Sequence, residues 1–199
     1  MSWENMNGNA VTEDNLLEMA KDEVRMRIAE TQKRDRAHLC TLLYGEAKCG
    51  KSGLALDSRT AQQIDKDCLV MVLDFDNGSE PTWRQNWNSD PNIMILNPIV
   101  RDNEGYPNLN ETIRLSEAFI VMAKDFMNEG KEVKFVFDGV DRWQQLCFLA
   151  MTEDKRSTQA KFMPLLWGVR NKTFDTLIEK ITDGLNCDRF FITHMKDVY

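Results

Sequence analysis

Residues 45–52 of the chain read Gly45-Glu46-Ala47-Lys48-Cys49-Gly50-Lys51-Ser52, and this octet is the best guide to the fold. It fits the phosphate-binding P-loop pattern G-x-x-x-x-G-K-[ST] at every fixed position. In such a loop, backbone N–H groups turn onto phosphate oxygens, the lysine reaches the β- and γ-phosphates, and the serine hydroxyl ligates Mg²⁺. We therefore predict that the octet and the following Gly53 bind a nucleoside triphosphate. The plain alternative is a glycine-rich turn that holds no ligand.

The sequence around the octet supplies the order strand, loop, helix that a phosphate-binding loop requires. Residues 39–44 form an apolar run that predicts a buried strand. Residues 51–64 contain few helix breakers and predict one helix.

Strand-like and helix-like patterns alternate from residue 37 onward. This alternation indicates an α/β domain over residues 37–199, with a mostly parallel sheet flanked by helices. We expect strands at 38–44, 68–74, 93–96, 132–137 and 189–194, and helices at 51–64, 111–128 and around 174–185. Asn110 is expected to cap the second of these helices and Gly130 to end it.

Residues 1–36 are polar and charged, yet Leu17, Ala20, Val24 and Ile28 recur at helical spacing. The pattern predicts an N-terminal amphipathic helix over about 13–34. Its apolar stripe is expected to pack on the core, and the alternative is an arm for homo-oligomerisation.

The composition is that of a globular protein and sets limits on its class. Of the 199 residues, 42% are hydrophobic and 29% charged, and the net charge is −7. That charge argues against a generally basic surface that coats nucleic acid, although a local basic stripe is compatible with it. No apolar run approaches a membrane span and the N-terminus does not resemble a signal peptide, so we expect no membrane partner and a cytoplasmic protein. The five cysteines are spaced singly, which indicates neither a zinc site nor a disulfide framework.

Asp138 is the candidate second ligand of the magnesium shell. It ends the apolar run 133–137, and such a carboxylate usually follows the strand next to that of the phosphate loop. The metal site is therefore predicted to comprise Ser52 and Asp138. An aspartate in this place is also common as a helix N-cap.

The apolar run 69–73 is followed by several acidic residues, among them Asp76 and Glu80. A carboxylate at this edge of the sheet can orient and deprotonate an attacking water, so both are candidate general bases. The alternative is that Asp76-Asn77-Gly78 is simply a turn.

The order of these features resembles the RecA-like ATPases, and in particular the small phage and archaeal-virus proteins of the Sak single-strand-annealing group. Asp138 looks like the Walker B residue of that family, and the strand that ends in Ile192-Thr193-His194 looks like its sensor strand. By this resemblance His194 would contact the γ-phosphate. Asp76 occupies the place of an acidic residue that is usually Glu, which is a departure.

The resemblance covers about residues 37–196 and implies a Mg²⁺-dependent ATPase that acts on single-stranded DNA in recombination, annealing or replication. Lys51, Asp76, Glu80, Asp138 and His194 would be its catalytic residues, and a viral protein would work in the host cytoplasm. A RecA-like core would continue beyond the sensor strand, so the resemblance implies either a C-terminally truncated chain or a reduced version of the fold.

Two other functions share the phosphate loop. One is a kinase of a nucleoside or other small acceptor, although no Arg-rich lid is evident; the other is an assembly module that nucleotide orders without hydrolysis. A GTPase fits less well, because Asn171-Lys172-Thr173-Phe174-Asp175 has one residue too many for N-K-x-D and is expected to open a helix.

Two further groups of side chains have a simple and a functional interpretation. Trp83 and Trp87 are expected to pack in a core or interface, and the alternative is stacking on bases. Lys155, Arg156 and Lys161 are expected to be a solvated loop, and the alternative is contact with phosphates.

Overall fold

The computed structural model describes residues 13–32, 38–151 and 164–194. The chain divides into two units, Met1–Ala37 and His38–Tyr199, and each is described by itself.

The first unit contains one helix, α1 (Glu13–Gln32), close to the predicted bounds. Ion pairs at i, i+3 or i, i+4 spacing line its surface: Lys21 with Glu18, Arg25 with Asp22, and Arg27 with Glu23. Leu17, Val24 and Ile28 are exposed on the helix. The packing of this apolar stripe on the core, or its use in homo-oligomerisation, stays a prediction.

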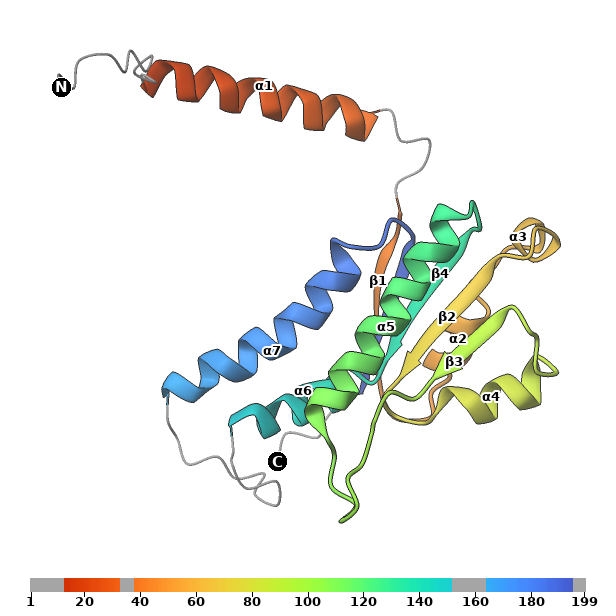
Figure 1. Ribbon diagram of the computed structural model, residues 1–199. Helices are drawn as coiled ribbons and strands as arrows, with labels where there is room; N and C mark the ends of the chain where they lie inside the picture. The colour runs from red at the N-terminus through yellow and green to blue at the C-terminus, as the bar shows by residue number, and fades with distance from the viewer. Residues whose placement is uncertain (1–12, 33–37, 152–163, 195–199) are drawn as a thin grey trace, which may run out of the picture. The chain divides into compact units, whose positions relative to one another are not determined.

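The second unit is built on a five-stranded sheet, as Figure 1 shows. Its strands are β1 (Cys40–Gly45), β2 (Leu69–Asp74), β3 (Ile93–Leu96), β4 (Val133–Asp138) and β5 (Asp188–His194). They lie in the order β1-β5-β4-β2-β3, and every neighbouring pair is parallel. The prediction of a parallel α/β sheet is therefore confirmed, and the sheet is compatible with a Rossmann or RecA-like core.

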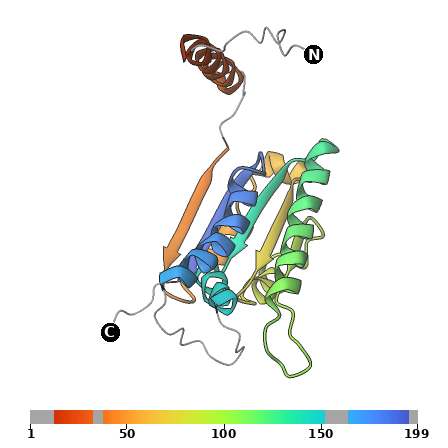
Figure 2. The same ribbon diagram turned by 60° about the vertical axis from the view of Figure 1, so that its left-hand side comes forward.

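Helices cover both faces of this sheet. They are α2 (Lys51–Leu56), α3 (Ala61–Asp65), α4 (Ser79–Asn86), α5 (Leu109–Asn128), α6 (Val140–Cys147) with the 3₁₀ turn η1 (Phe148–Met151), and α7 (Pro164–Thr182). Because side chains alternate along a strand, the central strands feed two cores. Phe135 and Phe137 belong to the larger cluster with residues of α5, α6 and α7, three helices that lie on the same face of the sheet (Figure 2). Val136 belongs to the smaller cluster with α2 residues and Trp83.

The register of the parallel strands sets the place of the functional side chains. Gly45 lies opposite His194, and Asp74 lies opposite Asp138. The carboxyl ends of β1, β5, β4 and β2 therefore meet along one edge of the sheet, where ligands bind in open α/β folds.

Several local predictions were wrong. The helix expected at 51–64 is two helices, because Thr60 begins α3 with a capping box that includes Gln63. The N-cap of α5 is Asn108, whose side chain accepts from the N–H of Glu111, and Asn110 lies inside the helix. The segment 171–175 lies in the middle of α7 and does not open it.

The prediction of a buried first strand was also wrong. β1 is an edge strand that pairs only with β5 in the described sheet, and its side chains alternate between exposed and half-buried. Leu42 and Tyr44 are 64% and 61% exposed. The apolar run thus predicted the strand correctly but not the burial of its side chains. Within the described residues, no helix has both the length and the apolar character needed to cross a bilayer.

Candidate functional site

The loop from β1 to α2 makes a sharp turn around the side chain of Lys51. Lys48 and Gly50 have φ angles of 64° and 89°, in the left-handed region that Gly50 adopts without strain. The ammonium group of Lys51 donates to the carbonyl oxygens of Gly45 (3.0 Å) and Glu46 (2.6 Å). A cation is thus held at the centre of the loop, where it can exchange these carbonyls for anionic oxygens.

A pocket of about 660 Å³ opens beside this loop, a volume typical of small-molecule sites. Of the predicted site residues, it brings together Ala47, Lys48, Gly50, Lys51, Ser52, Gly53, Asp76, Asp138 and His194. Gly78, Thr82 and Asn86, from the β2–α4 turn and α4, complete the lining, and the sequence interpretation had not singled them out as ligand contacts. Gly45, Glu46 and Cys49 belong to the loop without lining the pocket.

Asp138, at the end of β4, is buried and accepts two hydroxyl hydrogen bonds. The hydroxyls of Ser52 (2.6 Å) and Ser79 (2.8 Å) both donate to its Oδ2. The expectation that its strand would neighbour β1 was wrong, because β5 lies between them. Asp138 meets Ser52 nonetheless, since Ser52 belongs to α2, which follows the loop. A serine hydroxyl and a carboxylate are hard oxygen donors of the kind that Mg²⁺ prefers, so Ser52 and Asp138 fit this ion.

Asp74 organises the turn after β2 and had no separate role in the sequence interpretation. Its buried carboxylate accepts from the backbone N–H groups of Asp76 (3.0 Å), Gly78 (3.4 Å) and Ser79 (2.9 Å). Burial raises the pKa of Asp74 to about 6; the N–H of Ser79 opposes this shift and the charge of Asp138 adds to it. The chain does bend at residues 75–77, as the alternative of a simple turn has it, but the side chain that accepts the backbone N–H groups is Asp74. The carboxylate of Asp76 is thus left for other contacts.

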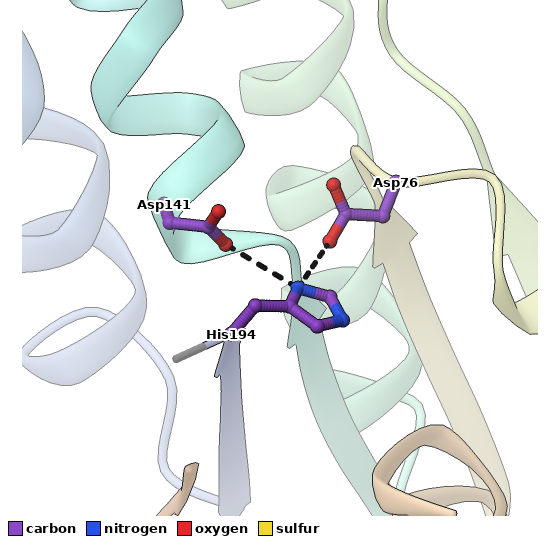
Figure 3. A group of neighbouring side chains, drawn as sticks. All are labelled: Asp76, Asp141 and His194. Atoms are coloured by element: carbon purple, nitrogen blue, oxygen red, sulfur yellow. Dashed lines mark ion pairs between the residues drawn. The ribbon is translucent and has the colours of Figure 1, made fainter. Parts of the chain in front are cut away.

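Asp76 faces His194 and Asp141, as Figure 3 shows. His194 Nδ1 lies 3.2 Å from Asp76 Oδ2 and 3.6 Å from Asp141 Oδ1. Burial raises the pKa of Asp76, and the charge of Asp141 raises it further, whereas His194 lowers it. A raised pKa suits a carboxylate that must accept a proton.

Gly139 makes room for this carboxylate. Its φ is 92°, and a Cβ built there would lie 2.9–3.1 Å from the carboxylate atoms of Asp76. Only glycine combines that backbone angle with such a close approach. The same residue is the N-cap of α6, which begins at Val140 and carries Asp141 in its first turn.

Two other predicted groups lie away from the pocket. Glu80 is exposed on α4, pairs with Arg84 at 2.7 Å and does not line the pocket. Trp83 and Trp87 pack against the smaller core cluster, and Trp83 Nε1 donates to the carbonyl of Asp90 (3.0 Å), which confirms the packing interpretation. Lys155, Arg156 and Lys161 lie outside the described residues.

Besides Asp74 and the lining residues of the β2–α4 turn and α4, sequence reasoning missed two contacts of the site, Ser79 and Asp141. Ser79 is the first residue of α4, and Asp141 lies in the first turn of α6. Both positions could have been noted as helix starts that follow a strand end, but only the fold shows what they contact. No protein-family model matches the chain, and no curated protein matches its sequence.

Proposed function

We propose that the chain is a RecA-like P-loop NTPase that binds ATP with Mg²⁺ and hydrolyses it. The observation that carries the proposal is the 2.6 Å contact between Ser52 and Asp138. These residues are far apart in the sequence, and they were the two predicted magnesium ligands. They meet at the pocket that Lys51 also lines.

Five side chains of the pocket have a role in this proposal. Lys51 neutralises the β- and γ-phosphates, and Ser52 and Asp138 hold Mg²⁺. When bound, the ion would neutralise charge that develops on the phosphate oxygens. His194 donates to an oxygen of the γ-phosphate, and Asp76 accepts the proton of the attacking water. Glu80 has no role in this proposal, because it is exposed, pairs with Arg84 and lies outside the pocket.

Nucleotide binding and phosphate release, measured on the full chain and two variants, test the proposal. Lys51→Ala should weaken ATP binding and abolish turnover, since it removes the charge on the terminal phosphates. Asp138→Asn should reduce turnover by roughly a hundredfold or more. Glu80→Gln is the matched control and should keep nearly full activity, because its carboxylate lies outside the pocket.

The products separate the alternatives. Free phosphate indicates hydrolysis, phosphate on an acceptor other than water indicates a kinase, and tight ATP binding without turnover indicates an assembly module. Normal turnover in folded Lys51→Ala would contradict the P-loop assignment. Action on single-stranded DNA and homo-oligomerisation stay predictions. Stimulation of hydrolysis by single-stranded DNA tests the first, and the mass in solution tests the second.

A further inference from the structure

Asp141 directs a carboxylate oxygen at His194 from outside the pocket. Its Oδ1 lies 3.6 Å from the Nδ1 atom of His194, beside the Oδ2 atom of Asp76 at 3.2 Å. Both carboxylate oxygens are shielded from solvent, and neither has a hydrogen-bond donor in the described part of the chain. Buried acceptors of this kind are normally satisfied, so the two atoms mark a place where an N–H belongs.

The imidazole of His194 can supply that N–H. Its Nδ1 faces both carboxylates, and the other ring nitrogen, Nε2, points away from them (Figure 3). His194 lines the pocket together with Lys51 and Ser52, whereas Asp141 does not line it. The Nδ1 side of the ring therefore faces the carboxylate pair, and the ring itself belongs to the lining of the proposed phosphate site.

We infer that Asp141 is a positioning residue that, with Asp76, holds the Nδ1–H of His194 and so directs Nε2 to the terminal phosphate. This inference rests on the proposed function. A phosphate oxygen is an acceptor and requires an N–H at Nε2. With Nδ1–H already directed at the carboxylates, the ring that donates at Nε2 is an imidazolium, whose charge the carboxylates and the phosphate both stabilise.

The division of labour between the two aspartates follows from their surroundings. Asp76 belongs to the pocket, and it moves with the β2–α4 turn that Asp74 holds. Asp141 belongs to the first turn of α6 and approaches the same Nδ1 atom from outside the pocket. When Asp76 takes up a proton from water, Asp141 still accepts the Nδ1–H and keeps the ring oriented. The other charged groups near this cluster are Asp138 and Arg142, together with Lys48 and Lys51 of the pocket.

Nitrogen NMR of the nucleotide-free protein tests the inference directly. The chain contains only two histidines, His38 and His194, so ¹⁵N-histidine spectra hold two rings, and a His38→Gln variant assigns them. In the wild type we expect His194 to carry its proton at Nδ1. Asp141→Ala should move the proton population toward Nε2, Asp141→Glu should restore it in part, and Asp125→Asn, an exposed site on α5, should change nothing.

Nucleotide titration supplies the functional readout. Asp141→Ala should bind ADP as the wild type does but lose about tenfold in affinity for a non-hydrolysable ATP analogue, because the oriented contact exists only with the γ-phosphate. Should Asp141→Ala fail to fold, Asp141→Asn is used in its place in both measurements, because it removes the charge at nearly constant shape.

Three results would overturn the inference. They are an unchanged His194 spectrum in the Asp141 variants, equal losses for ADP and the ATP analogue, and binding of Zn²⁺ or Mn²⁺ to the three side chains without nucleotide, which would make them a metal site. The NMR arm does not depend on hydrolysis. If Lys51→Ala retains full ATP affinity while the spectra change as expected, the proposed function fails and the contact between Asp141 and His194 stands.

Discussion

Gly139 lies between Asp138 and Asp141 in the sequence, and the absence of a side chain at this position is what the site requires. Its positive φ and the carboxylate of Asp76 within 3.1 Å of a built Cβ make two separate demands. A non-glycine residue at such a φ pays a backbone cost, and a side-chain clash adds to that cost only where space is short.

Gly139→Ala is therefore expected to lower the free energy of unfolding by about 1–3 kcal/mol and to displace Asp76. Urea denaturation and ATP turnover measure the two effects. Gly105→Ala is the matched control, since Gly105 has a φ of 87° and nothing within 4 Å of a built Cβ. It should cost only the backbone part and leave turnover unchanged; equal effects at both sites would contradict crowding at Asp76.

Asp74 makes stability depend on pH. Its folded-state pKa, about 6, lies above the ordinary value of 3.8, so the folded state binds a proton more tightly than the unfolded state does. The stability from this group is fully present below pH 3.8 and is lost as the pH rises through about 6. In metal-free buffer, the wild type should gain on the order of 2 kcal/mol over Asp74→Asn between pH 8 and pH 4.

Denaturation at a series of pH values measures this difference, and Asp90→Asn is its control. Burial raises the pKa of Asp90, but the hydrogen bonds from Arg59 and the N–H of Asn92 outweigh burial and lower it. The pKa of Asp90 therefore lies below its ordinary value of 3.8, and its variant should differ from the wild type by a constant amount between pH 5 and 8. A flat difference for Asp74→Asn would contradict the raised pKa.

The sequence predicted those side chains of the candidate site that belong to a recognisable local motif. The octet identified Lys51 and Ser52, and the strand end identified Asp138. Asp74 and Asp141 could not be assigned in this way, because their contacts depend on strand register and on the path of a turn. Neither is encoded in neighbouring residues alone.

At the scale of elements, a buried side chain between α2 and α3 makes tertiary contacts that the helical pattern of residues 51–64 does not indicate. The buried guanidinium of Arg59 donates to the carbonyl of Cys68 (3.2 Å) and to Asp90 Oδ2 (2.5 Å). These partners precede β2 and β3, so Arg59 connects the helix junction to the starts of two strands. The predicted single helix missed both the local capping box of Thr60 with Gln63 and this tertiary contact.

Arg59→Met should lower the free energy of unfolding by about 3 kcal/mol, because it leaves the Asp90 carboxylate and a buried carbonyl without their donor. Chemical denaturation measures the loss. Arg84→Met removes an exposed pair with Glu80 and should cost less than about 1 kcal/mol. Similar losses in the two variants would show that the buried contacts of Arg59 are not special.

For the whole molecule, the class of the sheet was predictable but its strand order was not. Alternating patterns gave the strands and their parallel direction, since parallel strands need crossover helices. The order depends on pairings between distant segments, such as β5 with β1. That pairing also left β1 at an edge, which an apolar run cannot reveal.

Among the residues that the structure describes, every buried hydrophobic side chain lies between Ala55 and Ile192, within the second unit. We therefore expect residues 38–199 alone to fold and to bind ATP with the affinity of the full chain. Thermal unfolding and titration with ATP, side by side with the full chain, measure this. An unfolded product would show that residues 1–37 supply part of the core, whereas loss of ATP affinity alone would assign them a role in binding.

The hydroxyl of Ser79 has a consequence for how this molecule can be observed. Ser79 shares the Oδ2 atom of Asp138 with Ser52 and is the first residue of α4, the helix that carries Trp83. A cation that takes this oxygen competes with the Ser79 hydroxyl and so shifts the start of a helix whose indole is hydrogen-bonded to Asp90. We therefore expect cation binding to change the tryptophan fluorescence, and comparison with Trp83→Phe separates the signal of Trp83 from those of the other four tryptophans.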